Sequence, residues 1–85
     1  MYQAEVRVML KPGVRDPQGQ AVGESLHALG FSSVDEVRIG KLLEVTLQAP
    51  SEEEALAQVD EMCRQLLANP VIESYRIALR EVSHG

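Results

Sequence analysis

Residues 11–19 join a strand pattern to a helix pattern, and they read Lys11-Pro12-Gly13-Val14-Arg15-Asp16-Pro17-Gln18-Gly19. Two prolines and two glycines in this short segment restrict the backbone more than a simple connection requires. Asp16 followed by Pro17 is typical of a helix N-cap with proline at the first helical position, where its missing N–H costs nothing. Gly19 is about 1 kcal/mol less favourable than alanine inside a helix and is expected to expose backbone. The segment is therefore predicted to be a stiff loop that presents a fixed surface.

The patterns on either side of this loop predict a strand and a helix. Residues 2–11 alternate between apolar and mostly polar side chains, as in a strand with one buried face. From Asp16 the period changes, and the apolar residues between 22 and 29 fall on one helical stripe. Gly30 is predicted to close this helix in the left-handed conformation.

Two further strands are predicted after the first helix. Residues 37–40 alternate over a short length, and Gly40-Lys41 stands where a two-residue hairpin turn is expected. Residues 43–49 alternate again. The pattern predicts a hairpin in which the third strand pairs back onto the second.

A second helix and a last strand complete the chain. Ser51 with Glu54 forms a capping box, and the acidic first turn suits the positive end of the helix dipole. The helix is predicted to end at Asn69-Pro70. Residues 71–79 are predicted to form the last strand, and residues 82–85 a frayed tail. The apolar stripe of the helix is the strongest helical signal in the chain and consists of Leu56, Val59, Met62, Cys63, Leu66 and Leu67.

The two halves of the chain resemble each other. Val6–Leu10 is similar to Leu43–Leu47, and Val34–Ile39 is similar to Ile72–Ile77. Two βαβ halves predict an α+β fold of the ferredoxin-like βαββαβ type, an antiparallel sheet with two helices packed on one face. With 85 residues, the chain is expected to form a single domain over residues 1–85.

The other face of this predicted sheet is left open. Its residues mix arginines with apolar groups, as subunit interfaces do, although an ordinary solvated face explains the same pattern. A domain of this size buries only roughly 60–65% of its unfolded surface, so a homo-oligomer, a dimer or higher, is expected. The residues predicted on the open face are Arg7, Met9, Arg38, Leu42, Glu44, Thr46, Ile72, Arg76 and Arg80.

Composition excludes several classes of function. The net charge of −5 argues against non-specific binding to nucleic acid. Of the eight basic residues only Arg64 falls in a clear helical pattern, which predicts acidic helices and a basic strand-and-loop side. The single cysteine, Cys63, excludes a disulfide within the chain. No apolar run approaches the ~20 residues that span a bilayer, and the N-terminus lacks the regions of a signal peptide. A cytoplasmic location without membrane contact is predicted.

A search for catalytic, cofactor-binding or metal-binding patterns finds none. The chain has no glycine-rich motif for phosphates, and His27 and His84 are not spaced to share a metal. Cys63 lies on the apolar helical stripe, which favours a buried structural thiol over a nucleophile. Tyr2 and Tyr75 are expected to point inward, so the open face lacks the stacking rings of an RNA-binding sheet. No catalytic, cofactor or metal residue is predicted.

Three segments of the chain carry a family resemblance. They are residues 11–19, Val37-Arg38-Ile39-Gly40-Lys41 and Leu66-Leu67-Ala68-Asn69-Pro70-Val71-Ile72-Glu73-Ser74-Tyr75. Together they resemble the PurS family, the small subunits of bacterial and archaeal phosphoribosylformylglycinamidine synthase. The resemblance covers almost the whole chain, in order and at the family's spacing.

The resemblance implies a non-catalytic subunit of an ATP-dependent, glutamine-using carbon–nitrogen ligase. In this family a large synthetase subunit converts formylglycinamide ribonucleotide to the amidine during purine biosynthesis, and a glutaminase subunit releases ammonia from glutamine. The small subunit dimerises and bridges the other two. ATP and Mg are expected on the large subunit, and no cofactor is expected on this chain.

The resemblance also makes the stiff loop a candidate docking surface for the two partner subunits. Gly40 and Pro70 are better explained by structural roles. The candidate docking residues are Lys11, Pro12, Gly13, Arg15, Asp16, Pro17, Gln18, Gly19, Arg38, Lys41 and Asn69.

Two other functions are compatible with the predicted fold. A ferredoxin-like dimer that senses a small molecule such as an amino acid requires a pocket of convergent polar groups between subunits. A small hydrolase such as an acylphosphatase requires a phosphate-binding loop with an arginine after the first strand. Arg15 is suitably placed, but Pro12 and Pro17 remove two N–H donors from that loop.

Overall fold

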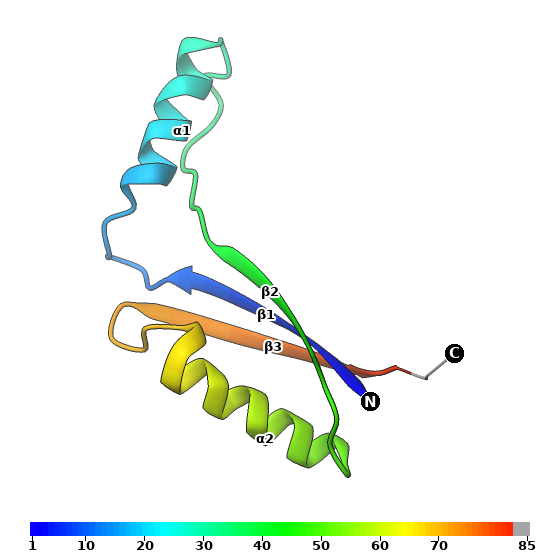
Figure 1. The fold of residues 1–85 in the computed structure, drawn as a ribbon. Coiled ribbons are helices and arrows are strands. Elements are labelled where there is room, and N and C mark those ends of the chain that lie inside the picture. Colours follow the sequence, from blue (N-terminus) through cyan, green and yellow to red (C-terminus); the bar gives the residue numbers. More distant parts are fainter. Residues whose placement is uncertain (83–85) are drawn as a thin grey trace.

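The centre of the fold is an antiparallel sheet with strand order β2-β1-β3, seen in a computed structural model that describes residues 1–82 (Figure 1). Strand β1 spans Tyr2–Leu10, β2 spans Lys41–Leu47 and β3 spans Glu73–Glu81. Val6 of β1 pairs with Leu43 on one side and with Ile77 on the other. Apart from Val82, the predicted tail at 82–85 lies outside the described residues. The α+β class and the antiparallel sheet are as predicted.

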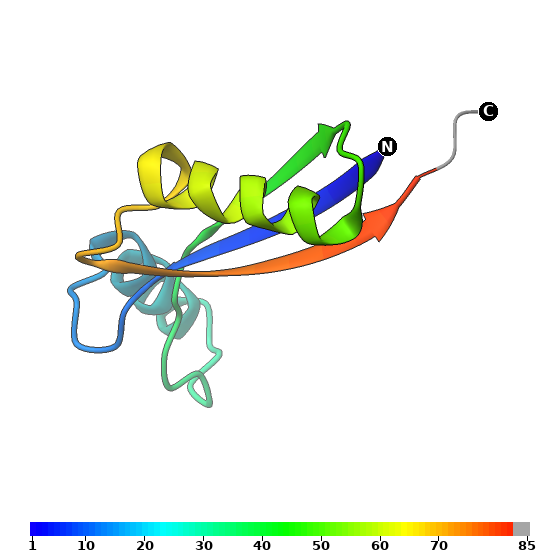
Figure 2. The same cartoon turned by 90° about the horizontal axis from the view of Figure 1, so that it is seen from below.

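Helix α2 covers one face of this sheet. It spans Glu52–Met62 and continues as a short π-helix over Cys63–Leu67 (η1), and it runs along the strands in Figure 2. Ser51 caps its start, since the Ser51 hydroxyl accepts a hydrogen bond from the Glu54 N–H at 3.2 Å. The cap and the helical extent agree with the sequence prediction.

The core is small and lies between β1 and α2. The alternating strand residues Ala4, Val6 and Val8 are buried against Val59 and Cys63. Because β1 is the middle strand, its inward side chains are covered on both sides, whereas those of the flanking strands are only half-buried. The alternation in residues 2–11 therefore identified the core face correctly.

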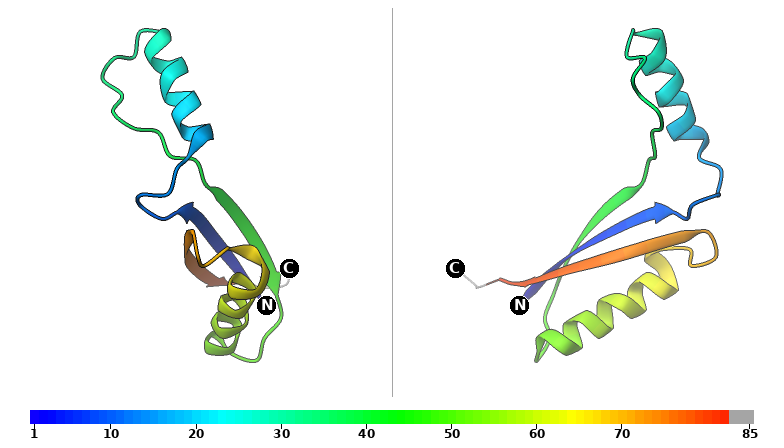
Figure 3. Two further views of the ribbon diagram at one scale, coloured as in Figure 1. Left: turned by 90° about the vertical axis from the view of Figure 1, so that its left-hand side faces the viewer. Right: turned by 180° about the vertical axis from the view of Figure 1, so that it is seen from behind.

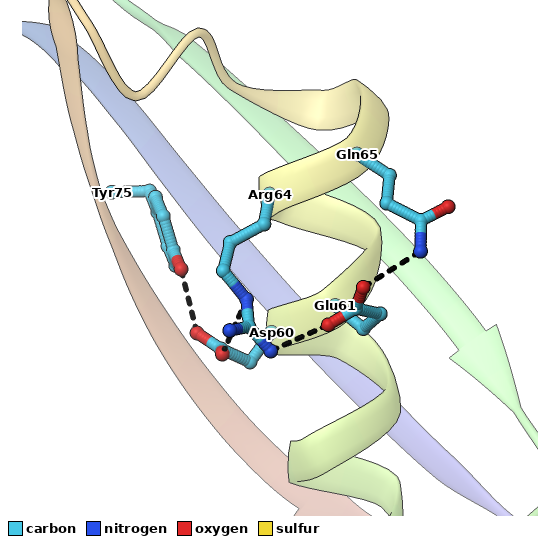
Figure 4. A network of polar contacts seen from close by, with 5 residues as sticks. All are labelled: Asp60, Glu61, Arg64, Gln65 and Tyr75. Carbon is cyan, nitrogen blue, oxygen red and sulfur yellow. Dashed lines mark hydrogen bonds and ion pairs between the residues drawn. The ribbon is translucent and has the colours of Figure 1, made fainter.

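One hydrogen bond joins α2 to β3, and further polar contacts surround it on the helix (Figure 4). The Tyr75 hydroxyl donates to Asp60 Oδ1 at 2.6 Å, and this hydrogen bond raises the pKa of Tyr75. Arg64 lies 3.2 Å from Asp60 and also contacts Glu61, whose carboxylate accepts from Gln65. The inward orientation predicted for Tyr75 is confirmed. The hydrogen bond between Tyr75 and Asp60 links the helix to the sheet.

Helix α1 departs from the prediction. It spans Pro17–Ala28, and instead of lying beside α2 it projects beyond the end of the sheet (Figures 1 and 3). Within residues 1–82 it has no extensive packing contact with any strand. The radius of gyration is 16.7 Å, against about 12 Å expected for a compact chain of this length. Only one of the two helices therefore covers the sheet of its own chain.

The hairpin expected at Gly40-Lys41 does not form. Residues 31–40 run back along α1 and lead into β2 without a turn, and within the described part of the chain they join no sheet. A two-residue hairpin with glycine first needs a positive φ at that glycine. Among the described glycines only Gly13 and Gly30 have one. Gly40 instead packs its backbone against the Val8 carbonyl and the Met9 side chain.

The end of α1 matches the prediction. Gly30 has φ +101°, its N–H donates to the His27 carbonyl, and the Phe31 N–H donates to the Leu26 carbonyl, both at 3.0 Å. These two bonds form a Schellman motif, which satisfies carbonyls that the helix leaves free.

The start of α1 differs from the prediction at Gly19. Gly19 was expected to expose its backbone, but it is buried. A Cβ atom at this position would clash with the Val37 carbonyl oxygen and with the Asp16 side chain. Glycine is needed here because the extended segment passes close to the helix.

We expect two glycine-to-alanine changes within α1 to have opposite effects. Gly19→Ala forces Val37 away and should destabilise the fold by about 1–3 kcal/mol, as overpacking does. Gly23→Ala places its Cβ 3.8 Å from Val37 Cγ2, an ordinary contact, and should stabilise by up to about 1 kcal/mol through helix propensity. Chemical denaturation of both variants measures the change in the free energy of unfolding. Equal changes in the two variants would refute the close packing at Gly19.

Candidate docking surface

The loop after β1 is held in place by the turn before β3. The Lys11 N–H donates to the Ile72 carbonyl at 2.8 Å, and Lys11 Nζ donates to the Pro70 carbonyl at 2.7 Å. The Val14 N–H donates to the Lys11 carbonyl, and Gly13 takes the positive φ of +88° inside this turn. Two segments far apart in sequence thus form one rigid end of the molecule. The lysine that sequence analysis assigned to docking also has this internal role.

Asp16 connects the same loop to the extended segment. Its Oδ1 accepts from the Gly19 N–H at 2.9 Å, as an N-cap does, and its Oδ2 accepts from the Ile39 N–H at 2.8 Å. The hydrogen bond from Ile39, then that from Gly19, and the nearby Arg38 charge hold the pKa of the Asp16 carboxyl below its ordinary value. The N-cap was predicted, but the second bond depends on a residue distant in sequence.

Arg38 completes the link between these segments. Its guanidinium donates to the Leu10 carbonyl at the end of β1. The structure therefore gathers the three segments that carry the candidate residues at one end of the sheet (Figure 3). Asp16 is half-buried and Gly19 is buried. The exposed candidates are Lys11, Pro12, Gly13, Arg15, Pro17, Gln18, Arg38, Lys41 and Asn69.

A groove of about 560 Å³ lies between the loop and α1. Arg15 and Arg38 line it together with acidic residues, so charges of both signs meet in it. His27 also lines the groove, and its Nε2 lies 2.6 Å from the Val34 carbonyl oxygen. Sequence analysis assigned the loop side of this groove to docking but not the α1 side. The helical spacing of Gln20, Glu24 and His27 is the signal that could have identified it.

A second groove, of about 650 Å³, opens on the uncovered sheet face. Its walls bring together Arg7, Arg38, Lys41 and Arg76 beside Leu42. Arg7 and Arg76 are directly opposite each other on β1 and β3. Like charges in such a pair are destabilising unless an anionic group approaches them. The mixed basic and apolar character predicted for this face is confirmed.

Elsewhere the described chain offers little reactive chemistry. Burial, with a smaller contribution from Asp60, raises the pKa of the Cys63 thiol, which keeps it protonated. Among residues 1–82 no cluster of His, Cys, Asp or Glu is arranged to hold a metal ion. No helix in that range is long and apolar enough to cross a membrane.

The chain is similar to known proteins both in sequence and in fold. The PurS family model, described as phosphoribosylformylglycinamidine (FGAM) synthase, matches residues 3–81. Phosphoribosylformylglycinamidine synthase subunit PurS of Synechocystis sp. is 53% identical, over 87% of this chain and 74% of that protein. The crystal structure of Methanocaldococcus jannaschii PurS, 40% identical, covers 98% of this chain and 100% of its own, with a TM-score of 0.88. A chain in the structure of PurLQS from Thermotoga maritima, 29% identical, has a TM-score of 0.85 over 93% of this chain and 96% of its own.

We expect Asp16→Asn to lower the melting temperature at neutral pH, because the amide puts an NH2 donor in place of one of the two oxygens that accept from Gly19 and Ile39. The folded-state pKa of Asp16 is lowered, so its stabilisation is complete above the unfolded pKa, about 3.9, and is lost as the pH falls through the folded value. The gap in melting temperature between wild type and variant should therefore close in acid. Asp35→Asn, an exposed aspartate in the neighbouring segment, is the matched control. A gap that does not change with pH would contradict this role of the Asp16 carboxylate.

Proposed function

Since this chain belongs to the PurS family of phosphoribosylformylglycinamidine synthase subunits, we propose that it is the small subunit that joins the synthetase and glutaminase subunits of that enzyme. The observation that carries the proposal is the family match over residues 3–81. The similarity to a chain of PurLQS supports an assembly of three kinds of subunit. The complex would make the amidine from formylglycinamide ribonucleotide, ATP and glutamine in purine biosynthesis.

In this proposal the chain supplies a surface rather than reacting groups. The raised pKa of the buried Cys63 makes it a poor nucleophile. ATP and Mg²⁺ would bind on the large subunit, and ammonia would come from the glutaminase. Holding the two partners together would let glutamine-derived ammonia be used efficiently, whereas free ammonia would bypass the need for this subunit.

The docking surface is proposed to be the rigid end of the sheet. Arg15, Pro17 and Gln18 are exposed there, next to a loop whose backbone is held by Asp16 and by the turn before β3. A preorganised loop loses little conformational entropy on binding, which favours affinity. Lys11, Pro12, Gly13, Arg38, Lys41 and Asn69 belong to the same end and complete the proposed surface.

The chain is also proposed to form a homodimer. The extended shape, the open basic and apolar sheet face and the strand edges that have no partner among residues 1–82 all leave surface that a second copy could cover. We expect sedimentation to give about 19 kDa, twice the chain mass of 9.4 kDa, at tens of micromolar. A species of single-chain mass in that range would contradict the dimer.

We expect the double change Arg15→Glu with Gln18→Ala to leave the melting temperature nearly unchanged, since both side chains are exposed. Reversing a docking charge should weaken the affinity for the two partner subunits by about tenfold or more, so that they separate from the chain on gel filtration. The rate at which the reconstituted complex forms the amidine from glutamine should fall, while its rate with free ammonia should stay unchanged.

The matched control applies the same two replacements to the outer surface of η1, the continuation of α2, as Arg64→Glu with Gln65→Ala. These residues make only exposed polar contacts, which contribute little to stability. The control should assemble normally. If the loop variant also assembles with unchanged affinity, the rigid end is not the docking surface.

A further inference from the structure

Two arginines on the open face of the sheet lie side by side without an acidic partner. Arg7 of β1 and Arg76 of β3 are directly opposite each other in the ladder, and both are exposed. Among residues 1–82 the ion pairs are those that Arg64 makes on the helix. Like charges in opposed positions destabilise a sheet, so this pair costs stability that the described chain does not recover by a charge contact.

A third arginine reaches the same place from a different segment. Arg38 lies in the extended segment before β2, and its guanidinium donates to the Leu10 carbonyl at the end of β1. This bond fixes the side chain and leaves further N–H donors of the guanidinium for a ligand. Arg7, Arg38 and Arg76 together line the groove of about 650 Å³ on the open face.

The carboxylates on the same sheet face lie outside this groove. Glu5 and Glu44 are opposite each other in the next row of the open face, two residues along the strands from Arg7 and Leu42. Neither glutamate lines the groove, and within residues 1–82 neither forms an ion pair with an arginine. The open face is therefore basic near the loop and acidic in the following row, and the groove lies in the basic part.

The groove also has an apolar side. Leu42 is opposite Arg7 on the other flank of β1 and is 57% exposed, and Met9 and Pro12 line the groove with it. The volume lies within the range of sites for small organic ligands, about 300–1,000 Å³. Positive charge at one side of the groove and apolar surface at the other suit an organic anion better than an inorganic ion.

We propose that this groove binds a small organic molecule that carries a diphosphate group. The planar guanidinium of arginine matches phosphate oxygens and binds them in pairs, and several arginines in one groove suit a group with several negative charges. The organic part of the ligand lies on Leu42 and Met9. This inference goes beyond the proposed function and does not depend on it, since Arg7 and Arg76 are not among the candidate docking residues.

The test is titration calorimetry of the full chain with two probes, ADP and inorganic pyrophosphate. A chelator in the buffer ensures that no metal ion mediates the contact. We expect ADP to bind saturably and more tightly than pyrophosphate, because only ADP has an organic part. Arg7→Gln and Arg76→Gln should each weaken ADP binding by about tenfold or more, since each removes charge-assisted hydrogen bonds to phosphate.

The matched control is Arg80→Gln, which removes the same charge from the same face of β3. Arg80 is bonded to Gln3 at 2.9 Å and lies outside the groove, so this variant should keep the affinity of the wild type for ADP. Thermal unfolding checks that the variants fold. Without ligand, Arg76→Gln should melt at or above the wild-type temperature, because the like-charge pair is gone. With ADP the order should reverse, since a ligand stabilises only the chain that binds it.

Several results would overturn the site. One is the absence of saturable binding by the wild-type chain at millimolar ADP, and another is an unchanged affinity for ADP in both Arg7→Gln and Arg76→Gln. Pyrophosphate that binds as tightly as ADP would reject the organic part of the ligand. A polyglutamate peptide that binds more tightly than ADP would identify an acidic protein segment as the occupant and would also reject the proposal.

Discussion

The carboxylate of Asp16 connects the segments on which the rest of this structure depends. It accepts one backbone N–H from Gly19 at the start of α1 and another from Ile39 in the extended segment. Pulling these segments apart would leave N–H groups without partners, which is costly when they are not fully solvated. Gly19 permits the contact because a side chain there would collide with Val37. As a result, α1 and the extended segment behave as one rigid unit, and the preceding loop is held at both ends.

This rigid end is the surface that the proposed small subunit would offer to its partners. The hydrogen bonds of Lys11 to Ile72 and Pro70 fasten the loop to the start of β3, so its exposed residues keep their relative positions. Basic residues gather on this end and on the open sheet face, whereas α2 is acidic. Such a separation of charge orients a small protein between different partners and guides their approach.

The small core explains why a partner copy would matter. Ala4, Val6 and Val8 fill little volume, and among residues 1–82 the helical cover over them comes from α2 and its continuation η1. The first βαβ half contributes a strand to this core but places its helix elsewhere. An unpaired strand edge beside half-buried side chains is prone to unspecific association unless it is covered. The proposed homodimer would cover surface of this kind with a second copy of the chain and make the association specific.

The candidate docking residues came from the family resemblance, and tertiary contacts bring their segments together. The sequence by itself determined the local elements: the alternating core strand β1, the Ser51 cap of α2 and the left-handed Gly30 at the end of α1. These depend on periodicity and on neighbours within a few residues, which a single sequence displays. Only the tertiary structure decided that α1 leaves the sheet, that Gly40 does not turn and that Gly19 is buried. Each of these depends on contacts between distant segments. Alternation indicates which face of a strand is apolar, but it does not indicate which element of the chain, or of a second copy, will cover that face.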